Sequence, residues 1–383
     1  MRLRAKYPGL KPRILIVDLS PFFGGGEAYV SQLVSLIFED YCPTVLCLNR
    51  QLVHNLKRKG ISVISLEPLA KLGKVVYVAT AMALLPVLIS LLRLDIVWIQ
   101  RTSEVWALPI ARLFGRKAVA TWHCMSITAV TTASTPAYRL RKMIYRAATR
   151  FADIVFAVSY AVAEDLKTVL PRKSVVVIPN WIAPCPSDLN EGERLPERFR
   201  ILFVGRLEPA KGAETLIDAV KKIDRKDVSV VFVGDGSERR ALHTRAQGIN
   251  AEFVGFCKDP RPYYIGSDLF VNPSLGPEGM PLVSLEALAH GIPCLLSDIA
   301  VHREITDNGS CARLFETGNV ADLSSAIEVL MDDPALMKVL SIRGRSVIQE
   351  RHIEHVAQVS YLRELHSLCR EQRSGSLMFT SSH

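Results

Sequence analysis

Short runs of apolar and β-branched residues alternate along the chain with longer segments of helical periodicity. Continuous apolar strands separated by helices are typical of parallel sheets covered on both faces. The pattern therefore predicts an α/β protein with two Rossmann-like, doubly wound parallel-sheet domains. The expected strands cover residues 13–18, 44–48, 95–99, 118–122 and 154–158 in the first half, and 200–204, 228–233, 251–254, 269–271 and 293–296 in the second.

The two series of strands are separated by a stretch rich in proline and charge, APCPSDLNEGERLPER, which follows Ile182 and has no period of its own. Such a stretch is typical of a linker, and a chain of 383 residues exceeds the ~250–300 at which one core stops growing. We therefore predict an N-terminal domain over 1–182, a linker over 183–199 and a second domain over 200–355. A helix over 356–370 is expected to pack back on the N-terminal domain, and 371–383 to be a disordered tail.

Segment 75–92 holds 18 residues without a charge, the length at which a membrane span must be considered. It contains Pro86 and is followed after two residues by the predicted strand 95–99. This order favours a crossover helix between two strands, either buried or in contact with a membrane, over a true span.

Charge is unevenly distributed between the halves. Residues 1–182 carry 24 Lys and Arg against 10 Asp and Glu, whereas residues 183–383 carry 23 against 28. A basic half can face nucleic acid, an anionic membrane or a negatively charged substrate. The chain has no zinc-finger spacing, no basic region followed by heptads and no aromatic RNA-binding signature, which argues against nucleic acid.

Composition and cysteine spacing exclude other classes. With 49% apolar and 22% charged residues the composition is that of an ordinary globular protein. The eight cysteines form no C-x-x-C pair and match no histidine spacing, so neither a zinc cluster nor a disulfide scaffold is indicated. The N-terminus lacks the pattern of a signal peptide, so we expect a cytoplasmic protein.

A glycine-rich turn, Gly24-Gly-Gly-Glu27, directly follows the first predicted strand and opens a helix. Backbone N–H groups at such a turn can receive a phosphate, although a merely tight turn is an equal alternative. Neither this turn nor Gly234-Asp-Gly236 has the spacing of a dinucleotide fingerprint, and no Walker A sequence is present. The sequence therefore argues against hydride transfer with a dinucleotide and against ATP-dependent chemistry.

Two cations and two carboxylates mark the second half. Arg206 follows a strand and Lys211 opens the next helix, a placement that suits a diphosphate, although ordinary surface charge is the alternative. Glu278 is expected in a loop, because Pro281 fits the first turn of a helix, and Glu286 inside that helix. A solvated face is the alternative for this pair, but the apolar neighbours of Glu286 require a partner for its carboxylate.

Taken together, these motifs resemble those of the group 1 glycosyl transferases, the retaining glycosyltransferase family 4 with the GT-B fold. The resemblance covers about residues 12–365 and rests on five ordered motifs: the glycine turn with Glu27, Val204-Gly-Arg206 with Lys211-Gly, Val233-Gly-Asp-Gly236, Pro273-Ser with Glu278 and Glu286, and Ala287-Leu-Ala with Gly291 and Pro293. It implies two domains that face a central cleft, the N-terminal one for the acceptor and the second for a sugar nucleotide.

Roles follow from the resemblance residue by residue. Arg206 and Lys211 would hold the diphosphate, Glu286 the ribose, and Glu278 the transferred sugar with the amides of Gly279 and Met280. Gly25 and Gly26 would approach the phosphates, His123 would lie near the transferred sugar, and the loop around Phe256 would meet the base. Cys124 stands where relatives commonly have an acidic or small residue.

The resemblance implies a hexosyltransferase that moves a sugar from a UDP- or GDP-sugar to a glycan or lipid-linked acceptor with retention, by front-face attack. The leaving diphosphate would be stabilised by Arg206 and Lys211 without a metal or other cofactor. The alternatives are a non-hydrolysing sugar-nucleotide epimerase and a non-catalytic sugar-nucleotide-binding protein.

Segment 138–151 carries the prediction of a membrane contact. One helical stripe of this segment is apolar, with Leu140, Met143, Ile144, Ala147 and Phe151, and another is basic, with Arg139, Lys142, Arg146 and Arg150. The pattern is typical of a helix packed on a sheet and equally of one that lies on an anionic membrane. With the basic N-terminal half, it predicts peripheral binding at the inner face of the membrane.

Overall fold

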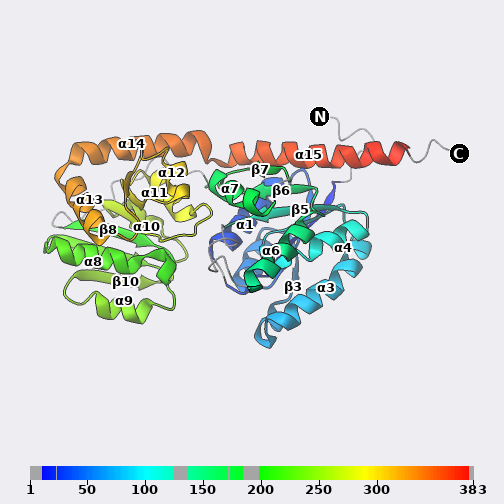
Figure 1. The fold of residues 1–383 in the computed structure, drawn as a ribbon, viewed down its shortest axis with the longest axis horizontal. Coiled ribbons are helices and arrows are strands. Elements are labelled where there is room, and N and C mark those ends of the chain that lie inside the picture. Colours follow the sequence, from blue (N-terminus) through cyan, green and yellow to red (C-terminus); the bar gives the residue numbers. More distant parts are fainter. Residues whose placement is uncertain (1–10, 23, 125–135, 171–172, 184–197, 379–383) are drawn as a thin grey trace. The chain divides into compact units, whose positions relative to one another are not determined.

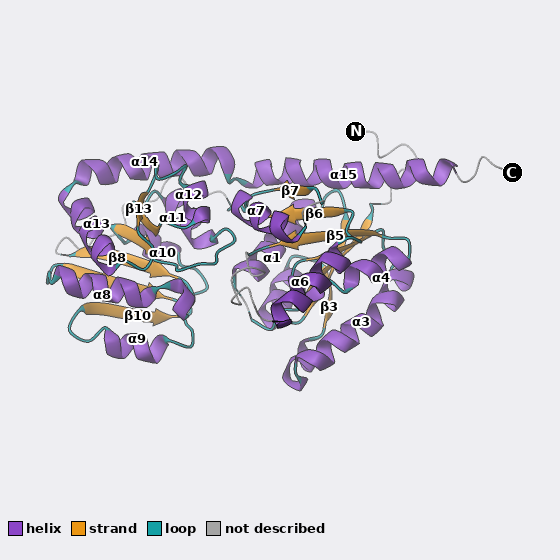
Figure 2. Ribbon diagram, viewed as in Figure 1, coloured by secondary structure: helices purple, strands orange, loops and turns teal. Residues whose placement is uncertain are grey.

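The computed structural model describes residues 11–22, 24–124, 136–170, 173–183 and 198–378. The chain forms two compact units: the first comprises Met1–Asn180 and His355–His383, and the second Trp181–Glu354. In each unit, helices cover both faces of one sheet (Figures 1 and 2). Most of the expected linker, residues 184–197, lies outside the described residues.

The sheet of the first unit has seven strands in the order β3-β2-β1-β4-β5-β6-β7, and all its pairings are parallel. The strands are β1 (Arg13–Asp18), β2 (Cys42–Cys47), β3 (Ser62–Ser65), β4 (Ile96–Ile99), β5 (Lys117–Trp122), β6 (Ile154–Ala157) and β7 (Val175–Val177). The helices are α1 (Gly25–Ile37), α2 (Arg50–Arg58), η2 (Glu67–Leu72), α3 (Lys74–Leu91), η3 (Thr102–Glu104), α4 (Ala107–Leu113), α6 (Pro136–Thr149) and α7 (Tyr160–Val169).

The second unit repeats this plan with six parallel strands in the order β10-β9-β8-β11-β12-β13. The strands are β8 (Phe199–Val204), β9 (Val228–Val233), β10 (Asn250–Gly255), β11 (Leu269–Asn272), β12 (Cys294–Ser297) and β13 (Arg313–Phe315). The helices are η4 (Pro209–Lys211), α8 (Ala213–Ile223), α9 (Arg239–Arg245), α10 (Arg261–Ile265), α11 (Leu282–His290), α12 (Ala300–Ile305), α13 (Val320–Asp332) and α14 (Pro334–Arg351).

The predicted fold class of two Rossmann-like parallel-sheet domains is confirmed, and every expected strand is present. Three strands were not expected from the pattern: β3, β7 and β13, each at the edge of its sheet. They have three or four residues, and β3 and β7 have no fully buried position. A half-buried strand of that length lacks the long apolar run that identifies the central strands.

The C-terminal helix α15 (Glu354–Met378) belongs almost entirely to the first unit. Its buried residues are Ala357, Tyr361, Leu365, Leu368 and Cys369, one stripe of the helix. The Tyr361 ring packs against Trp98 and Phe156, and its hydroxyl lies 2.5 Å from the Tyr29 hydroxyl. The sequence predicts disorder from residue 371, whereas α15 continues to Met378, since Gln and Arg extend a helix readily.

Helix α3 occupies the predicted crossover position, because it connects β3 and β4 of the same parallel sheet. It is the one described helix that is long and apolar enough to span a membrane. Only Tyr77, Ala81, Leu85 and Ile89, a single stripe, are buried. An apolar helix with one buried stripe leaves its remaining apolar surface exposed.

Candidate functional site

The loops after β8 and β11 meet at the topological switch point of the second sheet. β8 pairs with β9 on one side and with β11 on the other, so the chain winds away in opposite directions from this position. Loops at the carboxyl ends of such neighbouring strands form the usual ligand site of a doubly wound sheet. The loop after β8 carries Arg206 and Lys211, and the loop after β11 carries Glu278, Gly279 and Met280.

Lys211 and Glu278, 67 positions apart in sequence, form an ion pair with 2.5 Å between Nζ and Oε1. The neighbouring Gly212 explains how the two loops come so close. Its backbone is left-handed, with φ of +69°, and a Cβ there would lie 2.0 Å from the carbonyl oxygen of Pro273. Only glycine fits both the conformation and the space. The predicted cation and carboxylate therefore share one site.

Glu278 is buried, and its Oε1 contacts both Lys211 Nζ and, at 2.8 Å, the hydroxyl of Ser274. Gly279 and Met280 follow it in the same loop and are buried. The loop ends at Pro281, which caps α11. Glu278 thus lies in a loop and Glu286 in a helix, as the sequence predicts.

Glu286 lies in α11, and Tyr264 of α10 is the partner that its apolar surroundings require. The Tyr264 hydroxyl donates a hydrogen bond of 3.0 Å to Glu286 Oε2. Burial raises the pKa of Glu286 to about 6. The carboxylate is therefore ionised at neutral pH, yet protonates close to the physiological range.

Arg206 and Phe256 are exposed just after β8 and β10, at the same edge of the sheet as Lys211. The turn Gly234-Asp-Gly236 after β9 shapes this edge. A Cβ on Gly234 would lie 1.8 Å from the carbonyl oxygen of Gly205, and one on Gly236 2.3 Å from that of Leu207. These two glycines allow the turn after β9 to pack against the backbone on either side of Arg206.

In the first unit the glycine turn forms the N-terminus of α1, with Gly24 as the capping residue. The Glu27 carboxylate accepts a hydrogen bond of 2.7 Å from the Gly24 N–H, so one of the free N–H groups of the helix end has an internal partner. The position of a Cβ on Gly25 is open space, whereas one on Gly26 would lie 3.1 Å from Arg101. Of the two, Gly25 has room for a ligand.

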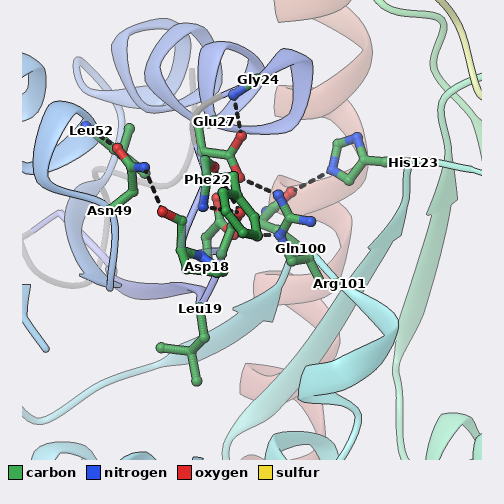
Figure 3. Close-up of polar contacts among 12 residues, drawn as sticks. Asp18, Leu19, Phe22, Gly24, Glu27, Asn49, Leu52, Gln100, Arg101 and His123 are labelled. Carbon is green, nitrogen blue, oxygen red and sulfur yellow. Dashed lines mark hydrogen bonds and ion pairs between the residues drawn. The ribbon is translucent and has the colours of Figure 1, made fainter. Parts of the chain in front are cut away.

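A buried charge cluster lies beside this turn, at the switch point between β1 and β4 (Figure 3). Arg101 pairs with Asp18 at 2.7 Å and also with Glu27. Glu104 accepts hydrogen bonds from the N–H groups of Leu19 and Arg101 at 2.7 and 3.1 Å. The guanidinium thus pairs with two buried carboxylates, and the backbone N–H of the same residue binds a third. Burial raises the pKa of Asp18 and Glu104. The cluster binds the turn to the ends of β1 and β4.

His123 follows β5 and contacts this cluster through Gln100, with 3.1 Å between His123 Nε2 and Gln100 Oε1. Since an amide oxygen only accepts, this bond requires the hydrogen on Nε2. Tyr29 packs edge-on against the imidazole, with 4.4 Å between ring centroids. Burial lowers the pKa of His123 to about 3, so the ring is neutral at physiological pH.

Sequence reasoning missed Asp18, Gln100, Arg101 and Glu104, although a signal was available. Each stands at or just after the carboxyl end of β1 or β4, where ligands of parallel sheets gather. Polar residues in such positions can be found once the strands are identified. Their mutual pairing, across 83 residues for Arg101 and Asp18, could not be found in that way.

Comparison with known proteins places each unit in a defined group. Residues 198–333 match the family model described as glycosyl transferases group 1. Residues 23–184 match the model of glycosyltransferase family 4. Together the two models span most of the chain.

Proteins of related sequence match this chain over only part of its length. A phosphatidyl-myo-inositol mannosyltransferase of Mycobacterium leprae is 29% identical over 156 residues, which are 39% of this chain and 41% of the relative. The lipopolysaccharide core biosynthesis glycosyltransferase LpsD of Rhizobium meliloti is 29% identical over 199 residues, 50% of this chain and 57% of the relative. The matches thus span about half the length of these relatives.

Solved structures match over nearly the whole chain. Anabaena Alr3699/HepE in complex with UDP has a TM-score of 0.78 at 19% identity, covering 93% of this chain and 100% of that one. Sucrose-phosphate synthase from Thermosynechococcus elongatus has a TM-score of 0.77 at 19% identity, with coverage of 94% and 100%. At such identity the likeness shows the fold.

Proposed function

Because this chain belongs to the group 1 glycosyl transferases of family 4 and has their GT-B fold, we propose that it is a retaining hexosyltransferase. The proposed donor is a nucleotide-diphosphate sugar with UDP or GDP, and the proposed acceptor is a glycan or a lipid-linked sugar. The observation that carries the proposal is the Lys211–Glu278 pair at the switch point of the second sheet, with Glu286 in the adjoining helix.

The charges of the second unit suit the donor. Lys211 and the exposed Arg206 offer positive charge to the diphosphate, where negative charge grows as the sugar leaves. In this proposal Glu286 accepts hydrogen bonds from the ribose hydroxyls and Glu278 accepts them from the transferred sugar. The backbone amides of Gly279 and Met280 also contact that sugar. Phe256 is exposed and provides an apolar surface for the base.

The proposed reaction needs no enzyme nucleophile and no metal. The bond between the anomeric carbon and the diphosphate oxygen breaks, and the acceptor oxygen forms its bond on the same face. The acceptor proton passes to the leaving diphosphate, whose charge the two cations stabilise. Configuration is retained because attack and departure share one face.

In the first unit, Gly25 and Gly26 are proposed to contact the phosphates and His123 the transferred sugar. A neutral His123 with its hydrogen on Nε2 presents Nδ1 as an acceptor, which suits a sugar hydroxyl. The same protonation state excludes an imidazolium ion as a general acid. His123 therefore has a binding role in this proposal.

The test is incubation with UDP- and GDP-sugars and a panel of glycan and lipid-linked acceptors. Transfer with retained anomeric configuration, read by NMR, supports the proposal. A changed sugar on an intact nucleotide would identify the epimerase alternative, and binding without turnover the non-catalytic one. Lys211→Ala should remove activity, while Lys222→Ala, an exposed lysine at the other end of α8, should retain it.

We further propose that the first unit binds an anionic membrane surface, and the orientation of α6 supports this. Its buried residues include Tyr145 and Thr149. The stripe that the sequence identifies as apolar is exposed at every position: Leu140, Met143, Ile144, Ala147 and Phe151. Within the described residues this stripe does not pack on the sheet, which supports a role in contact with a surface outside the unit.

Two neighbouring helices extend the exposed apolar surface. α4 contacts both α3 and α6, and the three lie side by side in Figure 1. Val75 and Leu91 of α3 are 82% and 73% exposed, and Leu113 of α4 is 83% exposed. Exposed apolar side chains of this size on neighbouring helices are typical of protein or membrane contacts. Arg139, Arg146 and Arg150 are exposed beside them, which favours an anionic bilayer.

Liposome flotation tests the membrane proposal. Each Lys or Arg near an anionic surface contributes about 1 kcal/mol, so binding should rise with anionic lipid and fall with salt. Serine at Arg139, Lys142, Arg146 and Arg150 should reduce it. The matched control, serine at Arg198, Lys221, Lys222 and Lys226 of the second unit, removes equal charge and should bind as wild type. Equal recovery with neutral vesicles, or none at all, would reject the proposal.

A further inference from the structure

Five buried polar side chains lie behind the Lys211–Glu278 pair in the second unit. They come from the ends of β11 and β12 and from the helices that follow these strands: Asn272, Ser274, Ser284, Ser297 and His302. Polar groups in a protein interior are costly unless each has a hydrogen-bond partner. The partners within this group define a connected chain.

His302 has a defined tautomer in this chain. Its Nδ1 lies 2.8 Å from the carbonyl oxygen of Ser297, and because a carbonyl only accepts, Nδ1 carries the hydrogen. Burial lowers the pKa of His302 to about 4, so the ring is neutral and Nε2 accepts. Asn272 Nδ2 is the donor to Nε2, at 3.3 Å. His302 and the Ser284 hydroxyl, which accepts from the same nitrogen at 3.0 Å, thus orient the Asn272 amide together.

Asn272 and Ser297 in turn hold Ser274. Asn272 Oδ1 accepts from the Ser274 N–H at 3.3 Å, and the Ser297 hydroxyl donates to the Ser274 carbonyl at 2.6 Å. The Ser274 hydroxyl then donates to Glu278 Oε1 at 2.8 Å. The connection from His302 therefore ends on the carboxylate that also pairs with Lys211.

We propose that His302 is a positioning residue for Glu278. Acting through Asn272, Ser297 and Ser274, it holds Oε1 of Glu278 in place and so directs Oε2 to the transferred sugar. The inference rests on the proposed function, because it takes Glu278 as the sugar contact. An apolar residue at 302 could fill the space, but only the Ser284 hydroxyl, 3.0 Å from Asn272 Nδ2, would then accept from the amide. One N–H of Asn272 would lose its acceptor, and Ser274 would be less firmly held.

The test compares binding of the sugar with binding of the nucleotide alone. Kd values are measured by calorimetry for UDP, UDP-glucose, GDP and GDP-mannose, with turnover on the donor that binds. In His302→Leu the Kd of the nucleotide should stay within about twofold, because Arg206, Lys211 and Glu286 remain. The Kd of the sugar nucleotide relative to its nucleotide should rise, and turnover should fall, each by about 10-fold or more, as for other supporting residues.

Two further variants separate positioning from stability. Thr306→Val removes another buried hydroxyl of α12 and its turn, whose partners are the His302 carbonyl and the Gly309 N–H. This variant should leave the ratio of the two Kd values, sugar nucleotide to nucleotide, unchanged. His302→Gln keeps an acceptor for Asn272 and should recover part of the loss. If His302→Leu does not fold, Ser297→Ala, which removes the bond to the Ser274 carbonyl, carries the same expectation.

The outcomes are distinguishable. A folded His302→Leu with the wild-type Kd ratio and turnover overturns the inference and leaves the proposed function standing. An equal loss for nucleotide and sugar nucleotide, matched by Thr306→Val, shows a structural role and also overturns it. Failure of the wild type to bind any of the four ligands removes the proposed function together with the inference.

Discussion

Gly212→Ala is expected to damage both stability and turnover, for two separate reasons. A residue other than glycine at φ of +69° costs about 1 kcal/mol. In addition, the new Cβ would lie 2.0 Å from the Pro273 carbonyl oxygen, whereas such contacts stay above 3.0 Å, so the two loops must separate by about 1 Å. Overpacking of this kind costs about 1–3 kcal/mol. The expected loss of unfolding free energy is about 2–4 kcal/mol.

The same displacement separates the residues of the site. Lys211 precedes Gly212, and Glu278 follows the Pro273–Ser274 segment, so the 2.5 Å pair between them should lengthen. A misplacement of ~1 Å in a catalytic group can lower turnover about 100-fold. Urea denaturation measures the first effect, and initial rates with the sugar-nucleotide donor measure the second.

Gly248→Ala is the matched control. Gly248 also has a left-handed backbone, with φ of +92°, but a Cβ there would meet nothing within 4 Å. It should lose only the backbone cost of about 1 kcal/mol and keep full turnover. If Gly212→Ala is no less stable than Gly248→Ala and turns over as wild type, the argument from loop contact is wrong.

Four further outcomes are expected. Arg206→Ala and Lys211→Ala should each lower turnover about 100-fold or more, because each removes a donor to the charge that develops on the diphosphate; wild-type rates in both would contradict the assignment. The Kd of the donor should rise as pH falls through about 6, since a protonated Glu286 accepts hydrogen bonds from the ribose more weakly. Glu286→Gln should bind the donor more weakly and without this pH dependence. A donor Kd unchanged in this variant would exclude the contact between Glu286 and the ribose. Because folding raises the pKa of Glu286, its contribution to the free energy of unfolding should decrease as pH rises from 4.5 to 6. Thermal unfolding of the wild type and of Glu286→Gln over this pH range measures the effect. Activity should survive EDTA, and a full loss that added metal reverses would refute the metal-free route.

The amino-acid pattern alone determines the class of fold. Ten apolar runs predict ten strands that are present, because a strand buried on both faces needs continuous apolar residues. The carboxyl ends of those strands also identify where Lys211, Glu278 and His123 belong. The edge strands β3, β7 and β13 have no such requirement, so the pattern does not reveal them.

Pairings across the chain depend on the tertiary structure. Lys211 and Glu278 are 67 positions apart, and they meet because Gly212 lets two loops touch. The cluster of Asp18, Glu27 and Arg101 likewise joins the ends of separate strands. Polar residues after a strand can be recognised from sequence, but their partners depend on strand order, which local patterns do not encode.

The orientation of the surface helix α6 is likewise not determined by the local sequence pattern. Its sequence shows an apolar stripe and a basic stripe, and periodicity alone allows the apolar stripe to face either the sheet or the solvent. Tyr145 and Thr149 are buried instead, and the apolar stripe is exposed. Sequence determines that a helix has two faces; packing against its neighbours decides which one is left for a partner.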